Sequence, residues 1–210
     1  MRTSKKTLVL KVDPVRPDRK AISFAAKKLK EGALVAFPTE TVYGLGANTL
    51  KDKAMERLYR VKNRPRSKPF TIHISDESLI RKLGCKVTKE ARRLMDRYWP
   101  GPLTIILAGK GKDKIGFRMP DNIVALRLIE ESASPIAAPS ANLSGARAPT
   151  DAEDVLNDLD GKIEILIDAG PTDIGVESTV VDMSDSRRPR ILREGAIGEE
   201  EILEELNSKY

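Results

Sequence analysis

Short apolar runs alternate with longer amphipathic segments along almost the whole chain, and this alternation constrains the fold more than any other feature. Helical segments separate the first strand-like runs, whereas several strand-like runs follow one another directly near the C-terminus. This order predicts an α/β open sheet of mixed parallel and antiparallel strands with flanking helices. The expected strands are 7–12, 33–37, 70–74, 103–108, 117–118, 135–139, 163–168, 178–183 and 190–193, and the expected helices are 17–30, 52–61, 76–83, 88–98, 122–131, 150–159 and 199–206.

Length and composition limit the number of domains and the class of protein. With 210 residues, 40% of them hydrophobic, the chain can bury one substantial core but is short for two domains. We therefore expect one domain over residues 1–210. The single cysteine, Cys85, excludes an internal disulfide framework and a cysteine-based zinc cluster. The sequence has no apolar stretch near the ~18 residues that cross a bilayer, and no signal peptide, so we expect a cytoplasmic protein without membrane association.

The loop after the second expected strand, "PTETVYGLGANT" at 38–49, raises the question of a phosphate site. Its two glycines are spaced as in a dinucleotide fingerprint, but Thr49 occupies the position of the third glycine, and the chain has no Walker-type P-loop. A glycine cradle is therefore not the expected phosphate site. The plain alternative is a strand-to-helix loop in which Gly44 and Gly46 supply positive φ angles.

A strongly basic segment follows at 51–70, with eight basic and two acidic residues, in a chain whose net charge is +6. If part of it is extended, alternate side chains project to the same side and could clamp phosphates. The alternative is an ordinary solvated basic loop. The alternating cations are Lys62, Arg64, Arg66 and Lys68.

Other polar residues lie just after or within expected strands. Arg118 stands in an apolar context, where it needs an internal or a substrate carboxylate. Ser140 and Asn142 follow a strand and offer polar groups to an anion, and Ser178 begins another strand. From these residues alone, the chain is a basic α/β protein that binds a phosphate-bearing ligand, either as a nucleotide-using transferase or as an RNA-binding protein.

Seven segments in order resemble the YrdC-like family of threonylcarbamoyl-AMP synthases and extend from about residue 20 to 198. They are "FPTETVYGLGAN", "KNRPRSKPF", "YWPGPLTIIL", "FRMPDN", "PIAAPSANLSG", "ESTVVDMS" and "ILREGAI". Some members of that family carry a second, C-terminal domain, whereas this sequence resembles the single-domain form.

The resemblance implies a fold, a reaction and partners. The implied fold is a twisted open sheet with a basic concave face. The implied reaction is formation of L-threonylcarbamoyladenylate and pyrophosphate from L-threonine, bicarbonate and ATP. A partner complex then transfers the threonylcarbamoyl group to the adenosine next to the anticodon in tRNA.

The resemblance also implies the roles of individual residues. The basic motif supplies the catalytic, phosphate-contacting cations. From the residues themselves, and not from the resemblance, we expect Mg²⁺ to enter with ATP, held by phosphates, water and a carboxylate such as Glu177. The threonine-side residues are Thr41, Tyr43, His73, Arg118 and Ser178; the nucleotide-side residues are Lys62, Arg64, Lys68, Ser140, Asn142 and Arg193.

Two alternatives remain open at this point. A non-catalytic protein could bind double-stranded RNA or tRNA through the same basic face, with a salt-sensitive affinity and no ATP turnover. A relative of the YciO-like branch could retain the fold and use a different substrate.

Overall fold

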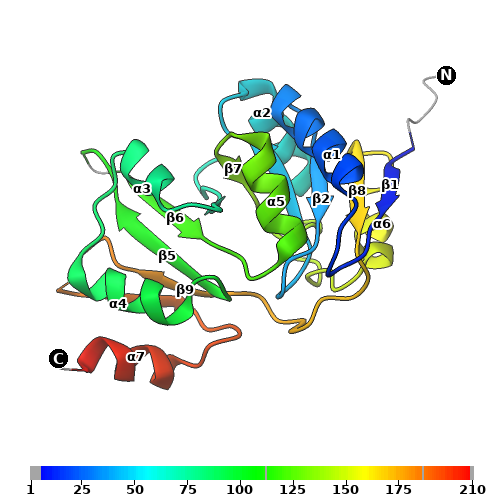
Figure 1. The fold of residues 1–210 in the computed structure, drawn as a ribbon. Coiled ribbons are helices and arrows are strands. Elements are labelled where there is room, and N and C mark those ends of the chain that lie inside the picture. Colours follow the sequence, from blue (N-terminus) through cyan, green and yellow to red (C-terminus); the bar gives the residue numbers. More distant parts are fainter. Residues whose placement is uncertain (1–5, 112, 186, 209–210) are drawn as a thin grey trace.

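The computed structural model describes residues 6–111, 113–185 and 187–208, and in these residues it contains one ten-stranded sheet with helices packed against it (Figure 1). Parallel and antiparallel pairs alternate irregularly across the sheet, which confirms the predicted mixed α/β architecture. From one edge to the other, the strands are β1 (Leu8–Lys11), β8 (Ile165–Asp168), β2 (Val35–Phe37), β3 (Gly44–Asn48), β7 (Ile136–Ala137), β4 (Ile72–His73), β6 (Lys114–Arg118), β5 (Leu103–Ala108), β9 (Thr179–Asp182) and β10 (Arg190–Arg193).

Local capping signals set the helix boundaries. The side chain of Asp18 accepts a hydrogen bond from Ala21 N, so α1 begins after Asp18 and not at Pro17 as the sequence predicted. Gly32 ends α1 in the left-handed conformation, with a φ of 107°. The helices are α1 (Arg19–Glu31), α2 (Asp52–Lys62), α3 (Ser78–Lys82), α4 (Lys89–Tyr98), α5 (Ile123–Ser132), α6 (Ala152–Leu159) and α7 (Glu199–Asn207). None of the helices in the described ranges is long and apolar enough to span a membrane.

The period-two alternation of β2 distributes its side chains between two core clusters. Ala36 packs with α2 and α6, whereas Val35 and Phe37 pack with α1 and α5. Both faces of this half of the sheet are therefore covered by helices. Figure 1 shows α1 and α5 side by side, with α3, α4 and α7 at the other end of the molecule.

The same alternation in β5 leaves one face of the other half open. Leu103, Ile105 and Leu107 are fully buried in the cluster that includes α4 and α7 residues. Thr104 and Ile106 point to the opposite face and line a cavity. One side of β5 therefore stabilises the fold while the other forms the wall of a site.

The segment predicted as a glycine loop forms strand β3 instead. Neither Gly44 nor Gly46 has a φ in the left-handed region, so their predicted role in bending the chain is wrong. A Cβ atom at Gly46 would lie 3.0 Å from a ring carbon of Phe37 and 3.2 Å from the carbonyl oxygen of Val35. Gly46 is therefore favoured by the close approach of β2 and the Phe37 ring to β3, whereas a Cβ atom at Gly44 would come no closer than 3.5 Å to its neighbours.

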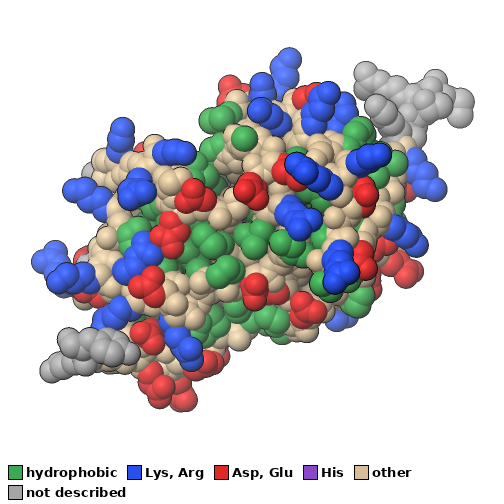
Figure 2. Space-filling model, in the orientation of Figure 1, with side chains coloured by type: hydrophobic (Ala, Val, Ile, Leu, Met, Phe, Trp, Pro, Cys, Tyr) green, Lys and Arg blue, Asp and Glu red, His purple; other side chains and the backbone are tan. Residues whose placement is uncertain are grey.

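The face of the molecule in Figure 2 carries lysine and arginine side chains interspersed with aspartate and glutamate. This view does not display the expected basic concave face, which stays a prediction.

Candidate functional site

A cavity of about 230 Å³ lies on the open face of β4, β6, β5 and β9. Several sequence-predicted residues that are far apart in the chain meet in its wall. The six that line it are Arg64, His73, Arg118, Ser140, Ser178 and Arg193. Five others, Thr41, Tyr43, Lys62, Lys68 and Asn142, do not line it.

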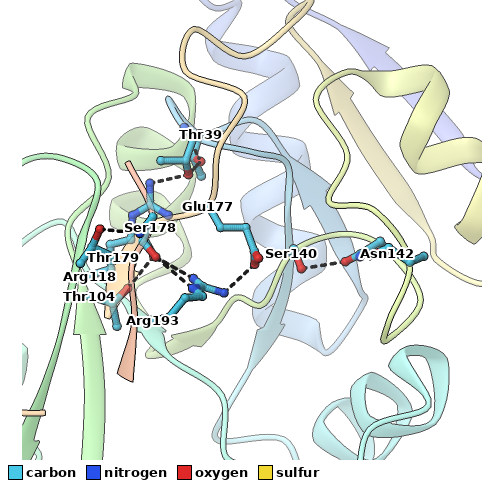
Figure 3. A network of polar contacts seen from close by, with 12 residues as sticks. Thr39, Thr104, Arg118, Ser140, Asn142, Glu177, Ser178, Thr179 and Arg193 are labelled. Carbon is cyan, nitrogen blue, oxygen red and sulfur yellow. Dashed lines mark hydrogen bonds and ion pairs between the residues drawn. The ribbon is translucent and has the colours of Figure 1, made fainter. Parts of the chain in front are cut away.

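Arg118, labelled in Figure 3, is almost completely buried, and two neighbouring side chains contact one end of its guanidinium. Its Nη2 donates to Thr41 Oγ1 at 2.7 Å and lies 2.9 Å from Glu40 Oε1. Burial lowers the pKa of Arg118, and the Glu40 carboxylate opposes this shift. Within the described ranges Nη1 makes no hydrogen bond, so it can receive an anion. Arg118 cannot bind a carboxylate through both Nη atoms in this structure, because Nη2 already contacts Thr41 and Glu40.

Glu40 is a buried carboxylate that sequence reasoning missed. Both of its oxygens are buried without a well-aligned hydrogen bond in the described part of the chain, although Oε1 forms the close ion pair with Arg118. Thr41 therefore holds Arg118 in position through a hydrogen bond and does not itself line the cavity. The sequence carried no clear signal for this arrangement, since Glu40 stands between two threonines, seventy-eight positions before the arginine it meets.

His73 lies directly beside Arg118, since the two residues are register partners in β4 and β6. Burial and the positive charge of Arg118 hold the pKa of His73 well below its usual range, so the imidazole is neutral. Its Nδ1 is buried and has no hydrogen-bond partner in residues 6–111, 113–185 and 187–208. This unpaired nitrogen is a feature of a binding site more than of a packed core.

Arg193 organises the opposite side of the cavity (Figure 3). Its Nη1 donates to Glu177 Oε1 at 2.7 Å, and its Nη2 donates to the Ser178 carbonyl oxygen at 2.9 Å and to Ser178 Oγ at 3.3 Å. Ser178 Oγ in turn lies 2.9 Å from Thr104 Oγ1. Arg193 and Ser178, assigned to different substrates from the sequence, thus belong to one network, which also contains Thr104, a residue that the sequence reasoning did not select.

Lys62 lies beneath the Ser140–Asn142 loop and outside the cavity wall. Its Nζ donates to the carbonyl oxygens of Ser140 and Asn142 at 2.6 and 2.5 Å, and to Asn142 Oδ1 at 2.8 Å. Burial, followed by the nearby charge of Arg64, lowers the pKa of Lys62 to about 8. All three ammonium donors are used within the protein, so in this structure Lys62 holds the loop that carries Ser140 and Asn142.

The other predicted phosphate cations do not project to the same side as Lys62, so the expected clamp is wrong in its geometry. Helix α2 continues through Lys62, and the chain then turns at Asn63, whose φ is 50°. Arg64 folds back, with its Nε donating to the Lys68 carbonyl oxygen at 3.0 Å, and it lines the cavity. Lys68 is exposed and lies outside the wall, and Arg66 lies 3.6 Å from Glu56.

Tyr43 also departs from its predicted place in the pocket. The side chain is fully buried, and its hydroxyl donates to the Gly170 carbonyl oxygen at 2.6 Å. Desolvation in this environment raises the pKa of Tyr43. The residue, which lies directly before β3, therefore ties the β2–β3 connection to the segment after β8, with its ring buried in the core.

The described residues contain no group of three or more histidine, cysteine or acidic side chains arranged to hold a metal ion. Glu177, the carboxylate expected near Mg²⁺, is paired with Arg193. The donor set does not fit a cation held by protein side chains alone.

Comparison with known proteins places these residues in a family context. The model of the Sua5/YciO/YrdC family, described as "Telomere recombination", matches residues 27–195. A Bacillus subtilis protein named threonylcarbamoyl-AMP synthase is 46% identical over 209 residues, which cover 95% of this chain and 60% of that protein. A Pyrococcus abyssi protein of the same name is 48% identical over 190 residues, which cover 86% of this chain and 56% of that protein.

Among solved structures, Pyrococcus abyssi Sua5 complexed with L-threonine superposes with a TM-score of 0.89 at 44% identity, over 96% of this chain and 61% of that one. The chain thus spans less than two thirds of the length of these three proteins. The residues matched by the family model, 27–195, include every residue that lines the cavity.

Proposed function

This chain belongs to the Sua5/YciO/YrdC family, and from that premise we propose that it forms threonylcarbamoyl-AMP and pyrophosphate from L-threonine, bicarbonate and ATP. The observation that carries the proposal is the buried Arg118 in the cavity wall. Its Nη2 is fixed by Glu40 and Thr41, whereas Nη1 makes no hydrogen bond within the described residues and is available to a ligand in the cavity that Arg118 lines. An amino-acid carboxylate is a suitable partner for a guanidinium in a site of this size.

The charges around the cavity suit the two stages of the reaction. In the first stage, bicarbonate loses hydroxide to give carbon dioxide, the neutral amine of threonine attacks its carbon, and the proton that the amine loses combines with that hydroxide as water while the carbamate forms. His73 is neutral, so it does not compete with Arg118 for the threonine carboxylate. In the second stage, a carbamate oxygen attacks the α-phosphorus of ATP and pyrophosphate leaves.

Positioning and charge stabilisation account for the second stage. Arg64 lines the cavity and is the nearest described cation of the basic segment to the ligand space. Lys62 acts through the loop that it holds, so that Ser140 faces the cavity. Mg²⁺ would accompany ATP as part of the substrate and would supply neutralisation of the phosphate charge, with phosphates and water as its main ligands.

The product is a reactive mixed anhydride, so a partner must accept its threonylcarbamoyl group. We infer that this partner is the enzyme complex that modifies tRNA next to the anticodon, in the cytoplasm.

The test is incubation with ATP, Mg²⁺, bicarbonate and individual amino acids, followed by measurement of pyrophosphate and detection of the adenylate by mass spectrometry. We expect both products with threonine, and we expect Arg118→Gln to lose them. Arg66→Gln, which removes an exposed charge outside the cavity, is the matched control. Salt-sensitive RNA binding without any adenylate would contradict the proposal and favour the RNA-binding alternative.

A further inference from the structure

Four residues from four adjacent strands form a single row across the cavity wall: His73, Arg118, Thr104 and Val180. His73 pairs with Arg118, and Thr104 pairs with Val180. Because Ile105 lies opposite Phe117 in the antiparallel β5–β6 pair, Thr104 lies opposite Arg118. Register partners on neighbouring strands project to the same face, about 4.8 Å apart. The row therefore presents an imidazole, a cation, a hydroxyl and an apolar side chain at regular intervals.

The hydroxyl in this row has spare hydrogen-bonding capacity. Thr104 Oγ1 and Ser178 Oγ are 2.9 Å apart, and either can be the donor. Arg193 Nη2 donates to Ser178 Oγ and does not use a hydroxyl proton. Each hydroxyl has one proton, and one hydrogen bond between the two consumes only one of them. Whichever way that bond runs, one hydroxyl proton at this buried position has no acceptor in the described ranges.

The surroundings make that unpaired proton costly unless a ligand accepts it. Thr104 is 3% exposed and Ser178 is 4% exposed, so neither hydroxyl is well solvated by bulk water. Val180, the partner of Thr104 on β9, and Ile106, two positions along β5, also line the cavity, and their side chains offer no acceptor. A ligand with a hydroxyl here completes the network, whereas a ligand with a methyl group leaves a buried donor unpaired.

We propose that Thr104, supported by Ser178, recognises the side-chain hydroxyl of bound threonine and thereby excludes valine. With the threonine carboxylate on Arg118 Nη1, the side-chain hydroxyl reaches Thr104 on the next strand, and the methyl group packs toward Val180. This inference rests on the proposed function and names the residue that determines its amino-acid specificity.

Thr104→Val tests the inference, because it removes the hydroxyl and nearly preserves shape. Threonine and valine binding are measured by calorimetry without ATP, and kcat/KM for adenylate formation is measured with each amino acid. We expect Thr104→Val to weaken threonine binding about tenfold and to leave valine binding unweakened, since one neutral hydrogen bond is lost. Thr104→Ser keeps a hydroxyl and is expected to stay within about threefold of the unmodified protein.

Thr71→Val is the matched control, because Thr71 is another hydroxyl residue of the cavity wall. It is expected to leave the threonine-to-valine ratio unchanged. If thermal melting shows that Thr104→Val is not folded, the same binding and kinetic measurements are made with Thr104→Ala.

An unchanged threonine-to-valine ratio in a folded Thr104→Val protein would overturn this inference alone, provided the unmodified protein forms the adenylate. An unmodified protein that neither binds threonine nor forms the adenylate would overturn the proposed function as well.

Discussion

Replacement of Lys62 by methionine separates two roles for this residue, loop support and direct ligand contact. The Lys62 ammonium donates to two backbone carbonyl oxygens and one amide oxygen of the Ser140–Asn142 loop. Methionine keeps a similar length and volume but has no donor. Asn142 Oδ1 retains the hydrogen bond from Ser140 Oγ, whereas the two carbonyl oxygens lose the contacts described here.

The expected loss of stability follows from these contacts. Each buried carbonyl left without a donor costs about 1–3 kcal/mol. Removing the ammonium also relieves its desolvation, which is the main reason that the pKa of Lys62 falls to about 8. We therefore expect Lys62→Met to lower the free energy of unfolding by about 2–4 kcal/mol.

Urea denaturation followed by circular dichroism at pH 7 measures this difference. Lys68→Met is the matched control, because Lys68 is an exposed lysine of the same segment. The midpoint is expected to fall for Lys62→Met with little change in slope, and to stay nearly constant for Lys68→Met. A loss below about 0.5 kcal/mol for Lys62→Met, equal to the control, would refute the loop-support role.

Three further predictions concern neighbouring residues. Gly46→Ala is expected to destabilise the protein by about 1–3 kcal/mol in the same assay, because the added Cβ would lie too close to the Phe37 ring. Unchanged stability would show that the Phe37 ring can move aside at little cost. Tyr43→Phe is expected to lower the free energy of unfolding by about 1 kcal/mol, because the hydrogen bond to Gly170 is lost, and to leave KM for threonine unchanged. A large rise in KM would indicate that Tyr43 contacts threonine after all. For His73 the depressed pKa means that, as pH falls below 6.5, the unfolded chain binds a proton that the native protein does not, so stability decreases with acidification. Comparison of His73→Gln with the parent protein should show a shallower decrease in the variant, and identical pH profiles would contradict a neutral buried imidazole.

Regular elements with strong local signals were predictable from the sequence. The apolar run at 103–108 and the run at 190–193 coincide with β5 and β10. Thr88, the first residue of the expected helix 88–98, caps α4, in keeping with the preference for threonine at this position. Strand β3 was missed because "GLGAN" has two glycines and no β-branched residue, and its pairing depends on Phe37 from another strand.

The candidate site was predictable in its residue types more than in its geometry. Arg118 was selected because an arginine in an apolar context requires an anionic partner, and the structure supplies one in Glu40. The orientation of Lys62 was wrong because an extended segment was assumed where α2 continues. Thr104 could not be selected, since threonine is common in strands and only the register of β5 with β6 and β9 brings it beside Arg118.

The central claim is that the cavity joins bicarbonate carbon to threonine before adenylation. The most direct test is to supply ¹³C-labelled bicarbonate with ATP, Mg²⁺ and threonine, and to isolate the adenylate for mass spectrometry. The account predicts an adenylate that carries the ¹³C label and depends on threonine. An adenylate of threonine without the label would show direct activation of the amino acid and would contradict the account.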